Sequence, residues 1–60
     1  MNVQTPTSPA LLGSVHRFGP HGVLYQVVGI LDDQRALIRV LETGEETPYP
    51  LRKVAADPAS

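Results

Sequence analysis

Cysteine and tryptophan are both absent from this chain of 60 residues. Without cysteine, neither a disulfide nor a cysteine-ligated zinc ion is available to stabilise the fold. A domain of this size buries only about 60% of the surface that its unfolded chain exposes, so its stability margin is thin. We therefore expect the missing stabilisation to come from tight packing, from self-association or from a partner protein.

Long apolar runs are also absent. Nowhere do about 18 apolar residues occur together, so the sequence predicts no membrane-spanning helix. Residues 1–9 carry no positive charge and no apolar core segment, so they do not match a signal peptide. These absences lead us to expect a cytoplasmic protein.

Composition changes along the chain indicate its organisation. Residues 2–9 read NVQTPTSP, a polar and proline-rich stretch with a single apolar side chain. Such a segment buries too little to offset the entropy lost when it becomes ordered. We predict a flexible arm over residues 1–9, a single small domain over residues 10–56 and a frayed end over residues 57–60.

Turn signals recur within the domain at a spacing typical of short antiparallel strands. They read GPHG at residues 19–22, DDQ at 32–34 and ETGE at 42–45, with apolar runs between them. In the first turn Pro20 fixes φ, and Gly22 tolerates a positive φ just beyond it. The pattern predicts strands over residues 12–18, 23–30, 36–41 and 45–49.

Three features refine this arrangement. Apolar residues at both parities of the second strand indicate either that both of its faces are covered or that it curves at Gly29. Pro48 and Pro50 lack the backbone N–H, which predicts an edge strand, and Gly44 is expected in the left-handed region of a hairpin.

The C-terminal region has helical spacing. Leu51, Val54 and Ala55 fall at i, i+3 and i+4, with Pro50 suited to the first helical position. The sequence therefore predicts an all-β fold: a small, incomplete SH3-like barrel of about four antiparallel strands with a short C-terminal helical turn.

Two segments carry a resemblance to a known family. GSVHRFGPHGVLYQVVG (13–29) and ALIRVLETGEETPYPLRKVAADP (36–58) contain the elements FGPxGxxY, IRVLETGEE and YPL and a closing DP. In these elements the chain resembles a family of very short bacterial proteins of unknown function. The resemblance covers about three quarters of the chain and implies one domain, but it carries over no activity, ligand or catalytic residue.

Catalytic and metal-binding patterns are weak. Ser14 and His16 share a strand parity and are able to approach one another, but no motif of a nucleophile surrounds them. His16 and His21, with Asp32 or Asp33, do not have the spacing of a zinc site. The acidic pairs 32–33 and 45–46 fall in turns, where they serve solubility. We expect no enzymatic activity, no cofactor and no metal.

Protein association has a physical motive in this chain. The domain is near the lower size limit, and it has apolar residues on both strand faces and unpaired sheet edges. We expect an interaction module that binds itself or a protein partner, a self-sufficient monomer being the alternative. Docking is expected at the edge strand 15–18 or at an apolar patch of Leu37 and Leu41. The residues expected to contact the partner are Phe18, His21, Tyr25, Leu37, Arg39, Leu41 and Tyr49.

The alternative to a protein-binding function is nucleic-acid binding, in which the SH3-like barrel binds RNA or DNA. Cations interleaved with aromatic residues favour it, because bases stack on aromatic rings while cations contact phosphates. The cations concerned are Arg17, Arg39, Arg52 and Lys53. Five basic and six acidic residues, with a net charge of −1, weigh against it. This alternative requires the four cations to converge on one face.

Overall fold

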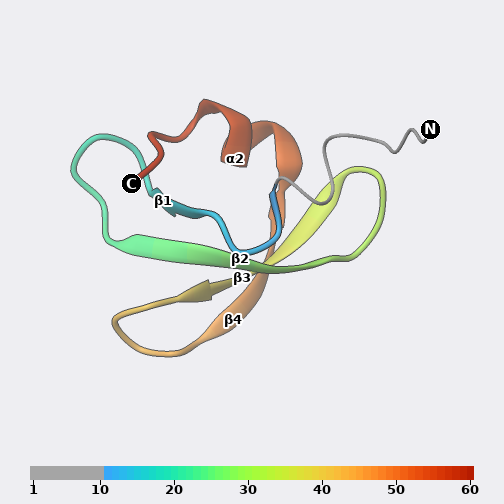
Figure 1. Cartoon of the computed structure of the whole chain (residues 1–60), viewed down its shortest axis with the longest axis horizontal. Coiled ribbons are helices and arrows are strands. Elements are labelled where there is room, and N and C mark those ends of the chain that lie inside the picture. Colours follow the sequence, from blue (N-terminus) through green and yellow to red (C-terminus); the bar gives the residue numbers. More distant parts are fainter. Residues whose placement is uncertain (1–10) are drawn as a thin grey trace.

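The computed structural model describes residues 11–60, so the arm predicted over residues 1–9 lies outside the described residues. The described elements are β1 (Val15–Arg17), β2 (Leu24–Ile30), β3 (Arg35–Val40), β4 (Glu46–Pro50) and α2 (Leu51–Ala56). The four strands form one antiparallel sheet in the order β1-β2-β3-β4 (Figure 1). The predicted all-β fold with a short C-terminal helix is confirmed, and the sheet is open, with β1 and β4 at its edges.

β1 is shorter than the strand expected over residues 12–18. Gly13 adopts a φ of 86°, and the Ser14 N–H donates to the Leu11 carbonyl at 2.9 Å, so the chain turns before the strand begins. At the other end the Phe18 N–H donates to the Val23 carbonyl at 3.1 Å and starts the next turn. Local backbone turns on both sides therefore leave three residues for the ladder.

The FGPHG turn uses its two glycines differently from the sequence expectation. The positive φ, 68°, belongs to Gly19 and not to Gly22. Gly22 is required for another reason: a Cβ at this position would overlap the carbonyl oxygen of Phe18 and lie 2.6 Å from the Phe18 Cβ. The turn folds back so tightly on Phe18 that only glycine fits.

The other two turns form as predicted. The Asp32 carboxylate accepts the N–H groups of Gln34 and Arg35 at 2.9 and 2.8 Å, which closes the loop between β2 and β3. In the hairpin between β3 and β4, Gly44 adopts a φ of 80° and donates its N–H to the Val40 carbonyl at 2.7 Å.

The apolar residues at both parities of β2 are explained by a bulge. Val27 pairs with Ile38 and Gly29 pairs with Leu37, so the register shifts between Val27 and Gly29. The extra residue bends the strand there, as expected for a curved strand. The bulge also changes which parity faces inward. Tyr25 and Val27 face the core before it, and Ile30 packs against the core after it.

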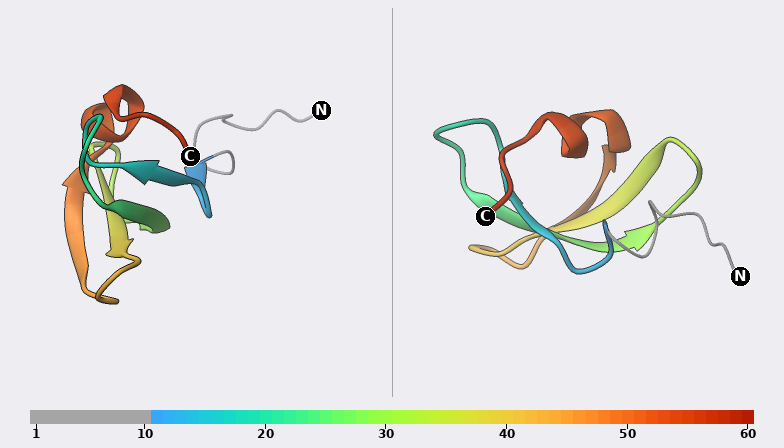
Figure 2. Two further views of the ribbon diagram at one scale, coloured as in Figure 1. Left: turned by 90° about the vertical axis from the view of Figure 1, so that its left-hand side faces the viewer. Right: turned by 45° about the horizontal axis from the view of Figure 1, so that its top comes forward.

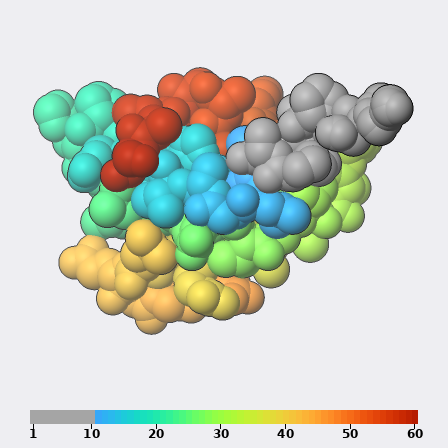
Figure 3. Space-filling model, viewed as in Figure 1, coloured from blue at the N-terminus to red at the C-terminus, as the bar shows by residue number. Residues whose placement is uncertain are grey.

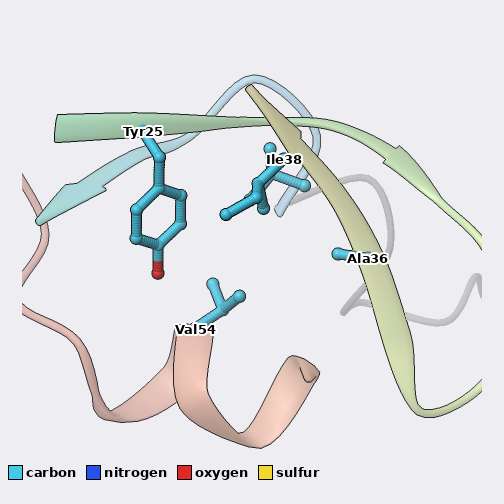
Figure 4. Close-up of a cluster of buried hydrophobic side chains, with 5 residues drawn as sticks. Tyr25, Ala36, Ile38 and Val54 are labelled. Carbon is cyan, nitrogen blue, oxygen red and sulfur yellow. The ribbon is translucent and has the colours of Figure 1, made fainter. Parts of the chain in front are cut away.

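The core lies between the inner face of the sheet and α2 (Figures 2 and 4). Figure 4 shows Val54 projecting from the helix toward Tyr25 and Ile38 on the strands. The fully buried residues are Tyr25, Val27, Ala36, Ile38 and Val54. This core is small, which agrees with the thin stability margin expected of a chain of this length.

α2 begins one residue later than the sequence suggested. Pro50 is the N-cap, with an extended ψ of 135°, and helical residues start at Leu51. Of the expected apolar stripe, Val54 is buried and Leu51 half-buried, whereas Ala55 is exposed. The helix has six residues, and among residues 11–60 no helix is long and apolar enough to cross a membrane.

The C-terminal residues are paired, which corrects the frayed end expected over residues 57–60. Ala59 forms an antiparallel bridge with His16. The Arg17 N–H donates to the Pro58 carbonyl at 3.0 Å, and the Ser60 N–H donates to the Val15 carbonyl at 2.9 Å. We name residues 58–60 the C-terminal strap; Figure 3 shows the end of the chain, in red, lying against the β1 region, in cyan.

Candidate functional site

Asp57 is the centre of a hydrogen-bonded cluster on the inner face. Its Oδ2 accepts the hydroxyl of Tyr25 at 2.7 Å and the hydroxyl of Tyr49 at 2.9 Å. Its Oδ1 accepts the backbone N–H of Gly19 at 3.3 Å. One carboxylate thus joins β2, β4, the FGPHG turn and the end of α2.

These contacts shift the pKa values of all three side chains. Hydrogen bonds from Tyr25, Tyr49 and the Gly19 N–H lower the pKa of the Asp57 carboxyl. Burial, reinforced by the hydrogen bond to Asp57, raises the pKa of Tyr49 to about 12, and the same causes raise the pKa of Tyr25. At neutral pH the carboxylate is charged and both phenols are protonated. The three hydrogen bonds link β2, β4 and the FGPHG turn to the end of α2.

The aromatic rings around Asp57 pack against one another. The centroids of Phe18 and Tyr25 lie 4.4 Å apart, and Tyr49 meets each of these two rings at 5.3 Å in an edge-on arrangement. Tyr25 is fully buried, and Phe18 and Tyr49 are half-buried. Three of the residues expected to contact a partner therefore contribute their rings to the core, where each pair adds about 0.5–1.5 kcal/mol beyond area burial.

Ser14 and His16 approach as their shared parity predicted. The Ser14 Oγ lies 2.9 Å from the His16 Nε2 and 2.7 Å from the Leu11 carbonyl oxygen. A carbonyl can only accept, so the hydroxyl proton is directed to Leu11 and Oγ accepts from Nε2. A serine nucleophile needs the opposite polarity, with the histidine taking the hydroxyl proton. His16 Nδ1 is buried and has no hydrogen-bond partner among residues 11–60, so within this part of the chain no third group orients the ring.

The opposite side of the sheet forms a broad surface that we name the outer face. Its side chains alternate along each strand with buried ones such as Tyr25 and Ile38. Among the elements described over residues 11–60, α2 packs on the inner face, and the outer face has no second layer (Figures 1 and 2). The outer face consists of Val15, Arg17, Leu24, Gln26, Leu37, Arg39, Leu41, Glu46 and Pro48.

Apolar and charged residues occupy separate rows on the outer face. Leu24 and Leu41 form one apolar row, linked by the Leu41 N–H bonded to the Leu24 carbonyl at 3.1 Å. Leu37 and Pro48 are register partners in another apolar row. Between these rows Arg39 donates two hydrogen bonds to Glu46, at 3.0 and 2.7 Å.

The remaining residues expected to contact a partner divide between the outer face and a turn. Leu37, Arg39 and Leu41 lie together on the outer face, where Leu41 is 44% exposed. His21 is exposed in the FGPHG turn, before β2. Leu37 and Leu41, the predicted apolar patch, thus lie on the same face. Phe18, Tyr25 and Tyr49 lie on the other side of the sheet, in and beside the core.

The four cations of the nucleic-acid alternative do not converge. Arg17 and Arg39 are on the outer face, where Arg17 donates to the Gly22 carbonyl at 3.1 Å and Arg39 pairs with Glu46. Arg52 and Lys53 are exposed on α2, which covers the inner face. The sheet therefore separates Arg17 and Arg39 from Arg52 and Lys53. The four cations do not share the single face that nucleic-acid binding requires.

Neither sheet edge is free along its whole length. On β4 the prolines at positions 48 and 50 leave the outward side of the edge without two donors, as predicted. On β1 the C-terminal strap bonds to two outward-facing groups, the Arg17 N–H and the Val15 carbonyl. The edge strand expected to dock a partner over residues 15–18 is therefore occupied by the chain itself.

Two further features of the described residues concern metal and ligand binding. No group of three histidine, aspartate or glutamate side chains gathers there with the geometry to hold a metal ion. A hollow of about 330 Å³ lies between the β2–β3 loop and α2 and is lined by Asp33, Gln34, Leu51 and Arg52. None of these four residues is fully buried, so the hollow offers no enclosed site.

Comparison with known protein families gives one match. A family described as a family of unknown function (DUF5397) matches residues 2–60. The chain belongs to this family. No curated protein matches the chain. The DUF5397 match spans the whole sheet, α2 and the strap.

Asp57 is the residue of this DUF5397 member that sequence reasoning missed. The sequence predicts a frayed end at this position, whereas the Asp57 carboxylate accepts hydrogen bonds from the hydroxyls of Tyr25 and Tyr49 and from the Gly19 N–H. A signal was present in the sequence: Tyr25 and Tyr49 both fall on the inner parity of their strands, and buried hydroxyls need acceptors. Asp57, the acidic residue that directly follows the helix, was the acceptor available.

Proposed function

We propose that this protein is a small non-enzymatic interaction module that associates with a second copy of itself through the outer face. The observation that carries the proposal is a sheet with its helix on one side and three leucines on the other, of which Leu41 is exposed and Leu24 and Leu37 are half-buried. A single sheet covered on one face leaves its second apolar surface in water, and sheet-on-sheet packing is the ordinary way to bury it.

The apolar content of the outer face supports an interface. Leu41 is 44% exposed, and Leu24 and Leu37 are half-buried although they occupy the middle of the sheet. Burial of such side chains contributes about 25 cal/mol per Å² of apolar surface removed from water. Because only five of the residues that the structure describes are fully buried apolar ones, this second apolar layer would add substantially to the core.

Charge placement favours a second copy as the partner. Arg17 is on β1 at one edge of the outer face, and Glu46 is on β4 at the other edge. In the proposed dimer the two outer faces pack against each other, and a two-fold axis runs between them, parallel to the strands and midway between β2 and β3. This axis places the β1 side of one copy over the β4 side of the second. Each Arg17 then faces the Glu46 side of its partner, and the Leu24–Leu41 rows cover one another.

The closed edges favour this face over strand addition. Pro48 and Pro50 deprive β4 of donors, and the strap occupies β1. A partner that adds a strand needs a free ladder edge. Packing on the outer face needs none.

The test is the molar mass in solution, measured by light scattering over a range of protein concentrations at low and high salt. Leu41→Ser should shift the equilibrium to monomer. Leu31→Ser is the matched control, because Leu31 is 46% exposed and lies at the opposite end of the sheet. A dimer that persists in high salt and is lost only in Leu41→Ser supports the proposal. A wild-type protein that stays monomeric at all concentrations overturns it.

A further inference from the structure

The outward edge of β1 is a second surface with unusual properties. Two of its outward-facing backbone groups, the Arg17 N–H donor and the Val15 carbonyl acceptor, are bonded to the strap. His16, between them, forms the bridge with Ala59. The strap therefore occupies the position of a fifth strand at this edge.

The strap follows directly on the Asp57 cluster and has few contacts of its own. Asp57, just before it, is fixed by the hydroxyls of Tyr25 and Tyr49 and by the Gly19 N–H. Pro58, Ala59 and Ser60 are all exposed. Their described hydrogen bonds to β1 are the two backbone bonds named above. Segments with few buried contacts and exposed hydrogen bonds open at low free-energy cost.

We propose that the β1 edge is a strand-addition site for the β1 edge of a second copy, and that the C-terminal strap closes this site within the chain. The donor and acceptor of the edge are self-complementary. When two β1 strands run antiparallel with His16 opposite His16, the Arg17 N–H of each copy reaches the Val15 carbonyl of the second copy. Both hydrogen bonds that the strap supplies are thereby replaced.

Side chains are compatible with this pairing. In the same register each Arg17 lies opposite a Val15, so the two arginines are not directly opposed. The pairing also ends with two copies, because the far edge of each combined sheet is β4, where Pro48 and Pro50 block further strands. Opening of the strap therefore leads to a closed dimer and not to a filament.

This surface differs from the outer face, and the experiment separates the two. Leu41→Ser is introduced first, to remove association through the outer face. In that background a chain that ends at Asp57 lacks the strap but keeps the Asp57 cluster. Light scattering should show a dimer whose dissociation constant is lower by about tenfold or more than that of the same variant with the strap, equivalent to ~1.4 kcal/mol.

Arg17→Pro is the specific control in the shortened chain. It removes the outward-facing donor at a position where an edge strand tolerates proline, and it should restore the monomer. A shortened chain that remains monomeric with its tyrosine circular dichroism intact overturns the proposal. A dimer that survives Arg17→Pro overturns it as well, because that dimer does not use this edge.

A measurement on the intact protein covers the case in which the shortened chain fails to fold. Amide hydrogen exchange should be faster at the Arg17 N–H, bonded to the strap, than at the Val27 N–H, which donates to the Ser14 carbonyl within the sheet at 3.0 Å. Ser60→Pro removes one of the two strap bonds and should accelerate exchange at Arg17 alone. Equal protection of Arg17 and Val27 in both proteins means that the strap does not open, which overturns the proposal.

Discussion

Tyr25 of β2 donates its hydroxyl to the Oδ2 of Asp57 at 2.7 Å, across 32 positions of the chain. The bond joins the most buried aromatic residue of the sheet to the residue that ends the helix. Because Asp57 also accepts from Tyr49 and Gly19, a single carboxylate fixes the place where the strap begins. The stability of the inner face and the closure of the β1 edge therefore depend on the same side chain.

Loss of the Tyr25 hydroxyl should destabilise the protein. Tyr25→Phe keeps the ring and removes one charge-assisted hydrogen bond from a buried site, so the free energy of unfolding should fall by about 1.5–3 kcal/mol. Tyr49→Phe removes the matching bond from a half-buried ring and should cost less. Urea unfolding of both variants checks the order. Equal and negligible losses would mean that the cluster does not stabilise the fold.

Acid should weaken the fold through Asp57. Its pKa is lowered in the folded protein, first by the Tyr25 hydrogen bond, relative to about 3.9 in an unfolded chain. The unfolded state therefore binds the proton more readily. The contribution of Asp57 is fully present above that unfolded value and is lost as pH falls through the folded pKa.

Asp57→Asn should therefore flatten the acid limb of a plot of unfolding free energy against pH. Asp32, whose pKa is lowered chiefly by the backbone N–H of Gln34, contributes to the same limb. Asp32→Asn is thus the matched comparison and should leave the Asp57 part in place. An acid limb unchanged by Asp57→Asn would contradict the assignment.

Alkali should weaken the fold through the two tyrosines. The pKa of Tyr49 is raised to about 12 by burial and by Asp57, whereas an unfolded tyrosine ionises near 10. The folded state holds the proton more tightly, so this contribution is complete below the unfolded value and is lost as pH rises through the folded one. Ultraviolet absorbance of tyrosinate should show delayed ionisation in the wild type. In Asp57→Asn the ionisation of Tyr49 should move toward the ordinary value.

The two glycines of the turns should respond differently to alanine. Gly22→Ala places a Cβ against the Phe18 carbonyl, a backbone atom that cannot move alone, and should cost more than about 2 kcal/mol. Gly44 has open space around it and a φ of 80°, so Gly44→Ala should cost only about 1–2 kcal/mol. Thermal melting of the two variants measures the difference. A larger loss at Gly44 would contradict the packing described for the FGPHG turn.

Most of the fold followed from local sequence signals. The turn signals at residues 19–22, 32–34 and 42–45, with the apolar runs between them, place three strands within one or two residues of their positions. Pro48 and Pro50 identified β4 as an edge, because a missing N–H is a property of the residue alone. Contacts between residues close in sequence decide such features, so the sequence suffices to predict them.

The candidate site was less accessible to sequence reasoning. Leu37 and Leu41, grouped by the sequence as an apolar patch, share one side of the sheet because alternation along a single strand sets the side of each residue. Tyr25 was expected at a surface, and its burial depends on α2 and Phe18, which reach it from distant parts of the chain. Aromatic residues serve cores and interfaces equally well, so residue type alone does not separate the two uses.

The sequence by itself determined the number and order of the strands, the turns between them and the blocked edge at β4, all of which depend on local backbone preferences. Only the tertiary structure decided that Asp57 joins Tyr25 to Tyr49, that the strap closes β1 and that the four cations lie on opposite sides of the sheet. These relationships depend on where the chain returns after α2. That return is set by the packing of Val54 against the sheet, a long-range contact that no local pattern encodes.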